Sequence, residues 1–486
     1  MKIFVAYPPL DTSRGVPLLS QNRQFQYFKE PTYIFPVVPA SAVTMLSESG
    51  FDVVWKDCIA QGIDQKEFLR LILQEKPDVI AFETKTPVVK QHWSLTREIK
   101  KTSPHCKIIL MGDHVTALPE ESFANSLVDF VLTGGDYDFL LLNLCKNLNS
   151  NGQIVNPEDL EQGIFYRQGE KIASSGQFQL NHDLNKIPMI NRDLVNWELY
   201  AYKNGNYKRT PGTYIMSGRD CWWGRCTFCS WPTLYPKFRV RSVSSVLDEI
   251  GQLIDKYKVR EIMDDTGSFP IGNWLKEFCN GMISRGYHKK INIDCNMRFG
   301  ALSLGEYSLM KKAGFRLVLF GLESANQPTL DRINKNLKVT QIVESCKLAK
   351  KAGLYPHITI MFGYPWESYG EALNTLNLGR WLLIKGYAHT VQATVVIPYP
   401  GSPLYEWCKE NNALTTQNWD DFHMKSPVMK INFSRQQLME LVRGIYSVAY
   451  NPEFVLRRLL SIRQKDDIYY FARGFKKVAG HIFDFK

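Results

Sequence analysis

Short runs of apolar residues alternate with longer amphipathic segments through the first 150 residues of the chain. The apolar runs have the length of buried strands, and the segments between them repeat apolar residues at the three-to-four-residue spacing of helices. The predicted strands are 2–7, 52–55, 79–83, 107–111 and 130–133, and the clearest helices are 40–48, 65–74 and 88–102. This alternation predicts βαβ units. Residues 1–150 are therefore expected to form a doubly wound Rossmann-like α/β domain, with its ligand beyond the carboxyl ends of the strands.

The pattern is lost between residues 151 and 205, where turn-forming residues such as those in SNGQIVNPEDLEQG predict a linker with a small hairpin. A second alternating series covers 206–405. Its six predicted strands are 213–217, 261–264, 292–296, 316–320, 357–362 and 391–397. Six units are too few for a closed eightfold barrel, so the series predicts a partial, TIM-like (β/α)6 barrel with active residues at the carboxyl ends of its strands. Residues 406–486 are predicted to be mostly helical, with a break at Pro452.

Composition is that of an ordinary globular chain: 44% of the 486 residues are hydrophobic and 22% are charged. No apolar run approaches the ~18 residues of a membrane-spanning helix, and the N-terminus predicts a first strand and not a signal peptide. Without an export signal the ten cysteines are expected in a reducing compartment, so a disulfide framework is not expected. A cytoplasmic location follows as the expectation.

The net charge of +11 is concentrated in two stretches. Residues 201–241 hold eight Lys or Arg and one acid, and residues 454–486 hold eight and three. Such stretches favour an anionic substrate, a nucleic acid or an anionic membrane surface. The alternative is two solvated faces without a partner.

Three of the cysteines form a cluster in the loop SGRDCWWGRCTFCSW, directly after the first strand of the second series. Cys221, Cys226 and Cys229 have the spacing C-x4-C-x2-C. Three thiolates on one loop can hold three irons of a [4Fe–4S] cluster and leave the fourth iron open to another ligand. Structural zinc normally takes four protein ligands, with a second pair at a similar spacing, and the sequence has no such second pair. The iron–sulfur interpretation is therefore favoured over zinc.

The loop and the six-unit series that follows it resemble the radical SAM superfamily. The N-terminal domain resembles the cobalamin-binding domain of its cobalamin-dependent class. Other stretches that carry the resemblance are GDHVTALPEE, DFVLTGGDYD, IPMINRDL, RVRSVSSVLDEI, GLESANQPTLDRINK, GYPWES and IPYPGSPLY. The usual spacing in the superfamily is C-x3-C-x2-C, so this loop has one additional residue. Gly224 would let the longer arm bulge, and Trp222 and Trp223 would either shield the cluster or pack over the barrel mouth.

The resemblance implies that S-adenosylmethionine (SAM) chelates the open iron and is cleaved to a 5′-deoxyadenosyl radical. It also implies which residues meet SAM. Phe228 would lie beside the adenine, Asp265 near the amino group, and Arg298 would pair with a carboxylate. Glu323 and Ser324 would contact the ribose or the methionine carboxylate, and Gly363 and Glu367 would lie near the adenine. The alternative role for each polar residue is a helix cap or a surface ion pair.

Cobalamin is the second cofactor that the resemblance implies. The N-terminal domain lacks a D-x-H-x-x-G motif, so cobalamin would bind base-off without that histidine. Gly112, Thr116, Gly134 and Gly135 are the loop positions expected to let the corrin and its nucleotide tail come close. His114 is expected nearby as a hydrogen-bonded group and not as a cobalt ligand. The alternative is a domain that only packs on the barrel.

The commonest reaction in such a class is C-methylation of an unactivated carbon, with cyclisation, oxidation or rearrangement as alternatives. A radical SAM enzyme that modifies RNA is a third alternative, disfavoured because the N-terminal domain has no second three-cysteine set and the C-terminus is helical. A cobalamin sensor or zinc scaffold without activity would not need the strand-end residues. The expected partners are a small-molecule or lipid substrate, which the charge would favour as an anion, and an electron donor such as a flavodoxin or ferredoxin. The C-terminal segment is expected to cap the barrel, with peripheral membrane contact as the second hypothesis.

Overall fold

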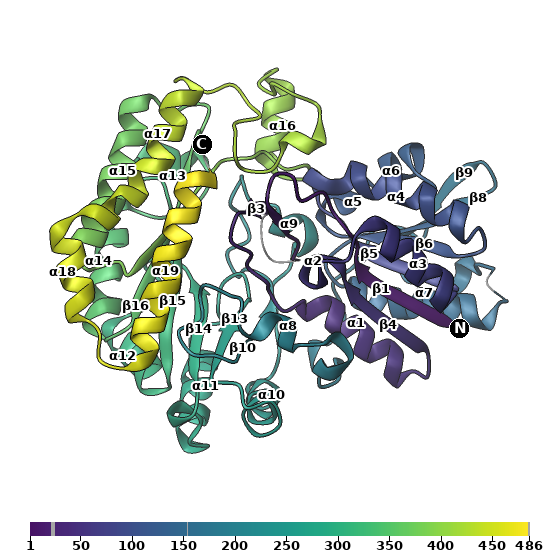
Figure 1. Ribbon diagram of the computed structural model, residues 1–486, viewed down its shortest axis with the longest axis horizontal. Coiled ribbons are helices and arrows are strands. Elements are labelled where there is room, and N and C mark those ends of the chain that lie inside the picture. The colour runs from purple at the N-terminus through teal and green to yellow at the C-terminus, as the bar shows by residue number, and fades with distance from the viewer. Residues whose placement is uncertain (21–24, 153, 485–486) are drawn as a thin grey trace.

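The computed structural model describes residues 1–20, 25–152 and 154–484. Two α/β units lie side by side (Figure 1), one built from the N-terminal third of the chain and the other from the barrel series. Both sheets were expected from the sequence, and the structure confirms an α/β fold with a parallel half-barrel.

The N-terminal sheet has seven strands. In spatial order they are β4 (Asp52–Asp57), β1 (Lys2–Tyr7), β5 (Val79–Glu83), β6 (Lys107–Met111), β7 (Phe130–Leu132), β8 (Ile164–Gln168) and β9 (Lys171–Ser174). The first five are parallel, with the strand order of a doubly wound domain. The hairpin β8–β9 continues the sheet antiparallel to β7, so the N-terminal unit extends beyond residue 150 into the predicted linker.

Helices cover both faces of this sheet, because its buried strands are apolar on both sides. On β1, Ile3 and Val5 belong to one apolar cluster, and Phe4 and Ala6 belong to the other. The helices on the first side are α1 (Val37–Glu48) and α7 (Tyr137–Ser150), and those on the second side are α3 (Gln65–Glu75) and α4 (Val89–Thr102). The carboxyl ends of the strands are left for loops, which carry the predicted cofactor residues.

The half-barrel sheet has six parallel strands in sequential order. They are β10 (Gly212–Ile215), β13 (Glu261–Asp264), β14 (Asn292–Met297), β15 (Phe315–Glu323), β16 (Tyr355–Phe362) and β17 (Thr390–Val395). The outer helices are α10 (Val243–Asp255), α11 (Asn273–Ser284), α12 (Leu304–Lys312), α14 (Val339–Lys351) and α15 (Tyr369–Ile384). Capping boxes begin α12 at Ser303 and α15 at Ser368. β10 and β17 are the two edges, so the barrel is open on one side.

Several short elements were not expected from the sequence. They are the hairpin β2 (Val16–Leu18) and β3 (Gln26–Phe28), the pair β11 (Gly218–Arg219) and β12 (Arg239–Val240), and the helices α2 (Cys58–Gln61), α5 (Asp113–Ala117), α6 (Pro119–Asn125), α8 (Glu198–Ala201), α9 (Trp231–Leu234) and α13 (Gln327–Arg332). Each is too short to show a periodic pattern. Most of them lie in loops of the two units or between them.

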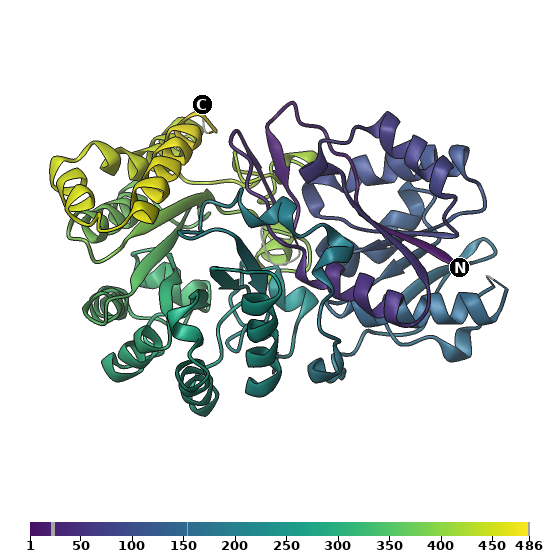
Figure 2. The same ribbon diagram turned by 60° about the horizontal axis from the view of Figure 1, so that its bottom comes forward.

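The C-terminal helices close the open side of the half-barrel. They are α16 (Pro403–Glu410), α17 (Arg435–Tyr446), α18 (Pro452–Leu460) and α19 (Lys465–Asp484). Figure 2 shows the last of them, in yellow, on the side of the sheet opposite the outer helices. α17 packs on β17, and α19 is tied to the start of the barrel by Arg260 Nη2 to Asp466 Oδ2 (3.0 Å) and by Arg473 Nη2 to the carbonyl of Tyr207 (3.0 Å). These contacts match the expected role of the segment as a barrel cap.

Candidate active site

The cysteine loop leaves the carboxyl end of β10 and is held from both sides. Gly218 and Arg219 pair with Val240 and Arg239 in a two-stranded ribbon. Further along, the Thr227 amide donates to the carbonyl of Ile333, and its carbonyl accepts from the Leu404 amide. The loop is therefore fixed to the end of the barrel and to the segment that follows β17.

All three cysteines of the loop line one cavity. Within residues 1–20, 25–152 and 154–484, no three His, Cys, Asp or Glu side chains converge closely enough for a single metal ion. The thiolates that bind a [4Fe–4S] cluster lie farther apart than the ligands of a single ion, because each of three irons takes one thiolate. Burial raises the pKa of the Cys226 thiol, and the neighbouring Lys335 and Arg298 charges oppose that effect. The loop fits a cluster in ligand type and in its cationic surroundings.

The additional residue of the loop is accommodated at Gly224, where φ is +57°. That left-handed conformation suits glycine, so the expected bulge is present. The two tryptophans before it are half-buried, and Trp223 Nε1 donates to the carbonyl of Asn334 (2.8 Å). The Arg298 guanidinium lies over both rings, 5.4 Å from the centroid of Trp222 and 4.6 Å from that of Trp223. Arg298 thus supports the longer loop as well as facing the cavity.

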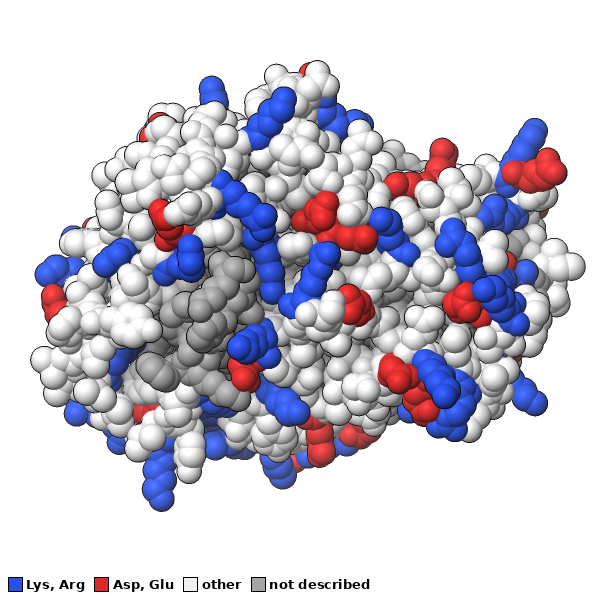
Figure 3. All heavy atoms as spheres, turned by 45° about the horizontal axis from the view of Figure 1, so that its top comes forward, with Lys and Arg blue, Asp and Glu red and all other residues white. Residues whose placement is uncertain are grey.

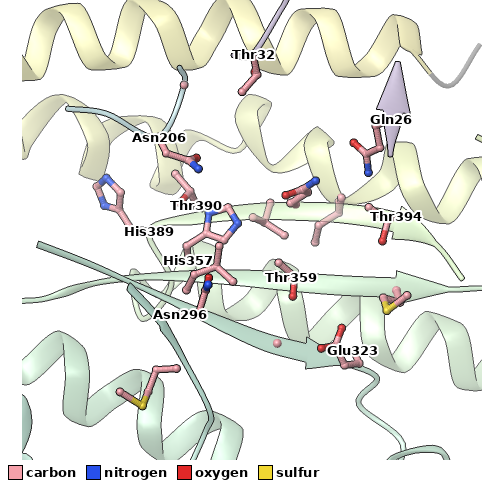
Figure 4. A pocket seen from close by; sticks show the side chains of 18 of the residues that line it. Gln26, Thr32, Asn206, Asn296, Glu323, His357, Thr359, His389, Thr390 and Thr394 are labelled. Carbon is pink, nitrogen blue, oxygen red and sulfur yellow. Dashed lines mark hydrogen bonds between the residues drawn. The ribbon is translucent and has the colours of Figure 1, made fainter. Parts of the chain in front are cut away.

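The cavity has a volume of about 660 Å³ and runs from the cysteine loop along the inner surface of the half-barrel. Its walls come from β14 to β17, from the β2–β3 hairpin and from α17, α18 and α19. Figure 4 shows Glu323 and Thr394 toward one end and His357, His389 and Asn206 toward the other. The site is therefore elongated and is bounded partly by segments far from the barrel in sequence.

Three of the seven residues expected around SAM line this cavity: Phe228, Arg298 and Glu323. Glu323 ends β15 at φ +63°, a conformation that L-residues rarely adopt and that turns the chain at the strand end. Its Oε1 is 2.7 Å from Nζ of the buried Lys335. Lys335 in turn is among the charges beside Cys226. This arrangement couples the Glu323 carboxylate to the cysteine loop.

The other four, Asp265, Ser324, Gly363 and Glu367, are not among the cavity-lining residues. The Ser324 hydroxyl donates to Glu367 Oε1 (2.6 Å), and Asn326 Nδ2 donates to the same oxygen (3.1 Å). Asp265 is buried, with its amide donating to the carbonyl of Ile215. These residues were expected in the site because each follows a strand end. Successive side chains at a strand end point in opposite directions, however, so some of them turn away from the cavity. The Ser324–Glu367 pair instead fixes the loops after β15 and β16.

Other cavity residues had not been selected from the sequence. Lys335 stands in the quoted stretch GLESANQPTLDRINK, so the resemblance contained a signal for it. Asp220 precedes the first cysteine, and Asn296 ends a predicted strand. His389 and Arg458 carried no local signal, because they come from segments that only the tertiary fold brings to the cavity.

At the edge of the N-terminal sheet, the predicted cobalamin residues bind one another. Thr116 Oγ1 donates to the carbonyl of Gly112 (2.6 Å) and accepts from the amide of Gly134 (3.0 Å). The His114 ring lies 3.2 Å from Thr86 Oγ1 through Nδ1 and 3.2 Å from Glu121 Oε2 through Nε2. Both ring nitrogens are engaged, in agreement with the expectation of a hydrogen-bonded histidine.

Gly134 and Gly135 do not open onto free space. A Cβ placed on Gly134 would lie 2.4 Å from the ring of Phe178, and one on Gly135 would lie 2.0 Å from the ring of Tyr235. The neighbouring Asp136 is buried. The rings of Phe178 and Tyr235 therefore pack directly on the two glycines, which leaves no room for a side chain at either position.

Ion pairs join the two α/β units at the same edge of the N-terminal sheet. Arg219 Nη2 lies 2.6 Å from Asp138 Oδ2 and its Nη1 lies 3.0 Å from Asp136 Oδ1, and Arg239 Nη1 lies 2.7 Å from Asp136 Oδ2. His182 Nδ1 reaches Asp136 at 3.0 Å and its Nε2 reaches Glu161 at 2.8 Å. Burial lowers the pKa of His182, but the hydrogen bonds to both carboxylates outweigh it and raise the pKa to about 9.

This histidine makes stability depend on pH. Because the folded-state pKa is raised above the ordinary 6.5, the contribution of His182 is fully present below pH 6.5 and is lost as pH rises toward 9. The urea midpoint of the wild type is expected to fall between pH 6.5 and 9.5 by more than that of His182→Gln. Equal falls in the two proteins would contradict the assigned ion pairs.

Residues 215–379 match the family model described as the Radical SAM superfamily. The chain is 27% identical over 431 residues to an uncharacterized methyltransferase of Pyrococcus horikoshii, covering 87% of this chain and 89% of that protein. It is 23% identical over 412 residues to the anaerobic magnesium-protoporphyrin IX monomethyl ester cyclase of Cereibacter sphaeroides, covering 83% of this chain and 65% of that one.

Among solved structures, the fold is similar to that of the radical S-adenosylmethionine methyltransferase TsrM from Kitasatospora setae with cobalamin and a [4Fe–4S] cluster bound. The TM-score is 0.71 at 12% identity, over 99% of this chain and 98% of that chain. At this identity the likeness establishes the fold. It extends over both α/β units, as the resemblance predicted, and also over the C-terminal helices.

Proposed function

Because residues 215–379 form a domain of the radical SAM superfamily, we propose that this chain is a radical SAM enzyme that holds a [4Fe–4S] cluster on Cys221, Cys226 and Cys229. When bound, the cluster supplies one electron that cleaves SAM, and the 5′-deoxyadenosyl radical formed then abstracts hydrogen from the substrate. The observation that carries the proposal is that the three thiols, Glu323 and Arg298 line one cavity.

The side chains around the cavity have distinct tasks in this proposal. The cations Lys335 and Arg298, beside Cys226, stabilise the negative charge of thiolate ligands. The Glu323 carboxylate, oriented by Lys335, accepts hydrogen bonds from ribose hydroxyls or from the amino group of SAM. The C-terminal helices, which line the cavity, limit the access of water, and this protects a radical from side reactions.

The reaction we propose is C-methylation of an unactivated carbon, with cobalamin as the second cofactor. Support comes from the methyltransferases among the relatives and from the fold shared with a cobalamin-bound enzyme. Cyclisation is the alternative, favoured by the likeness to an anaerobic cyclase. Cobalamin would bind at the carboxyl edge of β6 and β7, near Gly112, Thr116, Gly134 and Gly135.

Metal content tests the proposal directly. Protein purified without oxygen from cells supplied with cobalamin is expected to contain about four irons and one cobalt per chain. Methyl transfer from isotopically labelled SAM to candidate substrates would then separate methylation from cyclisation. Iron without cobalt would remove cobalamin from the proposal, and zinc without iron would overturn the radical mechanism.

Glu323 provides a sharper test of the SAM site. Glu323→Gln keeps the shape of the side chain but removes the charge opposite Lys335. The affinity for SAM is expected to fall about tenfold, as one charge-assisted hydrogen bond is lost, while the iron content stays the same. Anaerobic calorimetry with SAM measures this, with Glu344→Gln on the exposed surface of α14 as the matched control. An unchanged affinity in Glu323→Gln would exclude the carboxylate from SAM binding.

The substrate is proposed to be a small molecule or lipid, and the electron donor a flavodoxin or ferredoxin. Nucleic acid is not favoured, because on the face in Figure 3 acidic side chains lie among the Lys and Arg side chains. In the described part of the chain, no helix combines the length and hydropathy needed to cross a bilayer.

Peripheral membrane contact is a second proposal, carried by exposed apolar side chains on the C-terminal helices. They are Tyr450, Leu456, Leu459, Leu460, Ile468 and Tyr469. Arg457, Arg463 and Lys465 lie among them and are also exposed, the combination that binds anionic lipid surfaces. The protein is expected to float with phosphatidylserine liposomes at low salt and less with phosphatidylcholine liposomes. No flotation at low salt would dispose of this contact.

A further inference from the structure

The cavity has a second polar end, away from the cysteine loop. On β16, both His357 and Met361 line the cavity, and the four steps of strand from one to the other rise about 13 Å. In the register of the sheet, Ile360 pairs with Glu323, whereas His357 pairs with Leu319 near the middle of β15. A ligand that reaches from the SAM end to the second end must therefore be elongated.

Apolar side chains line most of the space between the two ends. They include Phe28 of the hairpin, Ile34 after it, Val391 of the edge strand β17, and Ile445 and Tyr446 of α17, and Thr359 of β16 is a polar side chain among them. Such a surface favours an apolar body over a polar one, because burying unpaired polar groups is costly. The middle of the cavity therefore selects for hydrocarbon.

Arg458 is the cation of the second end. It reaches the cavity from α18, where its Nη1 donates to Nδ1 of the buried His389 (2.5 Å) and its guanidinium lies 4.7 Å from the centroid of the Phe454 ring. Among the described residues it has no carboxylate within 4.0 Å. Its neighbour Arg457, by contrast, is paired with Glu453 at 2.9 Å. Within the described side chains, Arg458 thus faces the cavity without a carboxylate partner.

The charges around His389 are mainly positive. Burial lowers the pKa of His389 first, and Arg458, Arg316, Lys350 and Lys208 lower it further. The carboxylates nearby are already engaged: Asp294 and Glu261 pair with Arg316, and Asp467 pairs with Lys208. The imidazole therefore stays neutral and accepts from Arg458, and its ring stacks on Tyr355 with centroids 4.2 Å apart. The guanidinium is held in place while its remaining N–H groups stay available to a ligand.

We infer that Arg458, positioned by His389, binds an anionic head group, so that the substrate is an elongated apolar molecule with an oxyacid at one end and the reacting carbon toward the other. A guanidinium matches carboxylate and phosphate with two parallel hydrogen bonds. The carboxylate or phosphate monoester of a straight or branched hydrocarbon chain has this chemistry. The position of the reacting carbon rests on the proposed function. The anion site itself does not depend on that function.

Binding of simple probes to the anaerobically reconstituted protein tests the inference. Decanoate, decyl phosphate and 1-decanol share one chain and differ in the head group. Calorimetry is expected to show that at least one of the two anions binds ten times more tightly than 1-decanol, and the tighter anion identifies the head group. Arg458→Gln is expected to weaken that binding at least tenfold, and Arg458→Lys less. Arg457→Gln, an adjacent exposed arginine, is the control that retains wild-type binding.

Two outcomes would overturn the inference: decanol binding as tightly as both anions, or wild-type anion affinity in a folded Arg458→Gln. The wild-type comparison needs no variant, so it decides the matter even where circular dichroism shows that Arg458→Gln does not fold. Cleavage of SAM measured on the same wild-type samples keeps the two hypotheses apart. Cleavage without anion selectivity would contradict the anion site alone, and anion selectivity without cleavage would contradict the radical mechanism alone.

Discussion

Replacing Cys226 by alanine is expected to abolish cluster binding and to lower the rate of SAM cleavage by at least about 10³-fold. The thiol lies on the cavity wall beside Lys335 and Arg298, and no other cysteine of the described chain lines that cavity except Cys221 and Cys229. A cluster with three protein ligands has no spare thiolate to take over. The same result is expected for Cys221→Ala and Cys229→Ala.

Iron content, the visible absorption of the cluster and the formation of 5′-deoxyadenosine measure this effect. Cys408→Ala is the matched control, because Cys408 is buried in the C-terminal region and contacts Met429. It is expected to keep the cluster and the cleavage rate. A Cys226→Ala protein with four irons and normal cleavage would show that the loop does not carry the cluster.

Arg219→Met is expected to lower the free energy of unfolding by roughly 3–5 kcal/mol, the usual result of removing one partner of a buried ion pair. Asp138 and Asp136 are both buried, and Arg219 contacts both of them at the junction of the two α/β units. Without the guanidinium, Asp138 loses the partner that its two carboxylate oxygens share. The loss of stability should therefore affect the N-terminal unit and the barrel together.

The ion pairs between the two units also predict that the protein loses stability in acid. Burial raises the pKa of Asp136, but hydrogen bonding with His182 and the charges of Arg219 and Arg239 outweigh it and leave the pKa well below the ordinary 3.8. A depressed carboxylate pKa contributes stability that is complete above about pH 4 and is lost as pH falls below it. Acid unfolding of Arg219→Met is therefore expected at higher pH than that of the wild type.

Urea titrations at pH 7 and at pH 4 measure both effects. Arg70→Met, which breaks the exposed pair with Glu67, is the control and should leave the free energy of unfolding nearly unchanged. A loss as small as that control in Arg219→Met would mean that the junction tolerates two uncompensated carboxylates, and the charge-based account of the interface would be wrong.

Much of the fold could be predicted from sequence pattern. The strands at 79–83 and 107–111 have the predicted bounds, and all six barrel strands form, in the predicted order and parallel. Buried strands in parallel sheets are nearly continuous apolar runs, and that local signal does not depend on the rest of the chain. The cysteine loop was equally visible, since its three cysteines stand within nine residues of one another.

The cavity walls were predicted less well. Glu323 and Arg298 line the cavity, but Ser324 and Glu367 pair with each other beside it, although all four follow strand ends. A position at a strand end predicts only the region of the fold in which a residue lies. A shift of one residue along the strand turns the side chain to the opposite face of the sheet. The hairpin β2–β3 and α18 contribute walls because they pack on the barrel from a distance, which no local pattern records.

By itself, the sequence of this protein determined the order of strands and helices, the two α/β units and the three-cysteine loop proposed to hold the cluster, because each depends on spacing along a short stretch of chain. Only the tertiary structure decided which polar groups share the cavity, that the C-terminal helices close the barrel, and that Phe178 and Tyr235 pack on Gly134 and Gly135. Arg219 meets Asp136 across 83 positions, and Arg458 meets His389 across 69. Such pairs form because burial in a packed core leaves a charged or polar group only the partners that the fold brings within hydrogen-bonding distance.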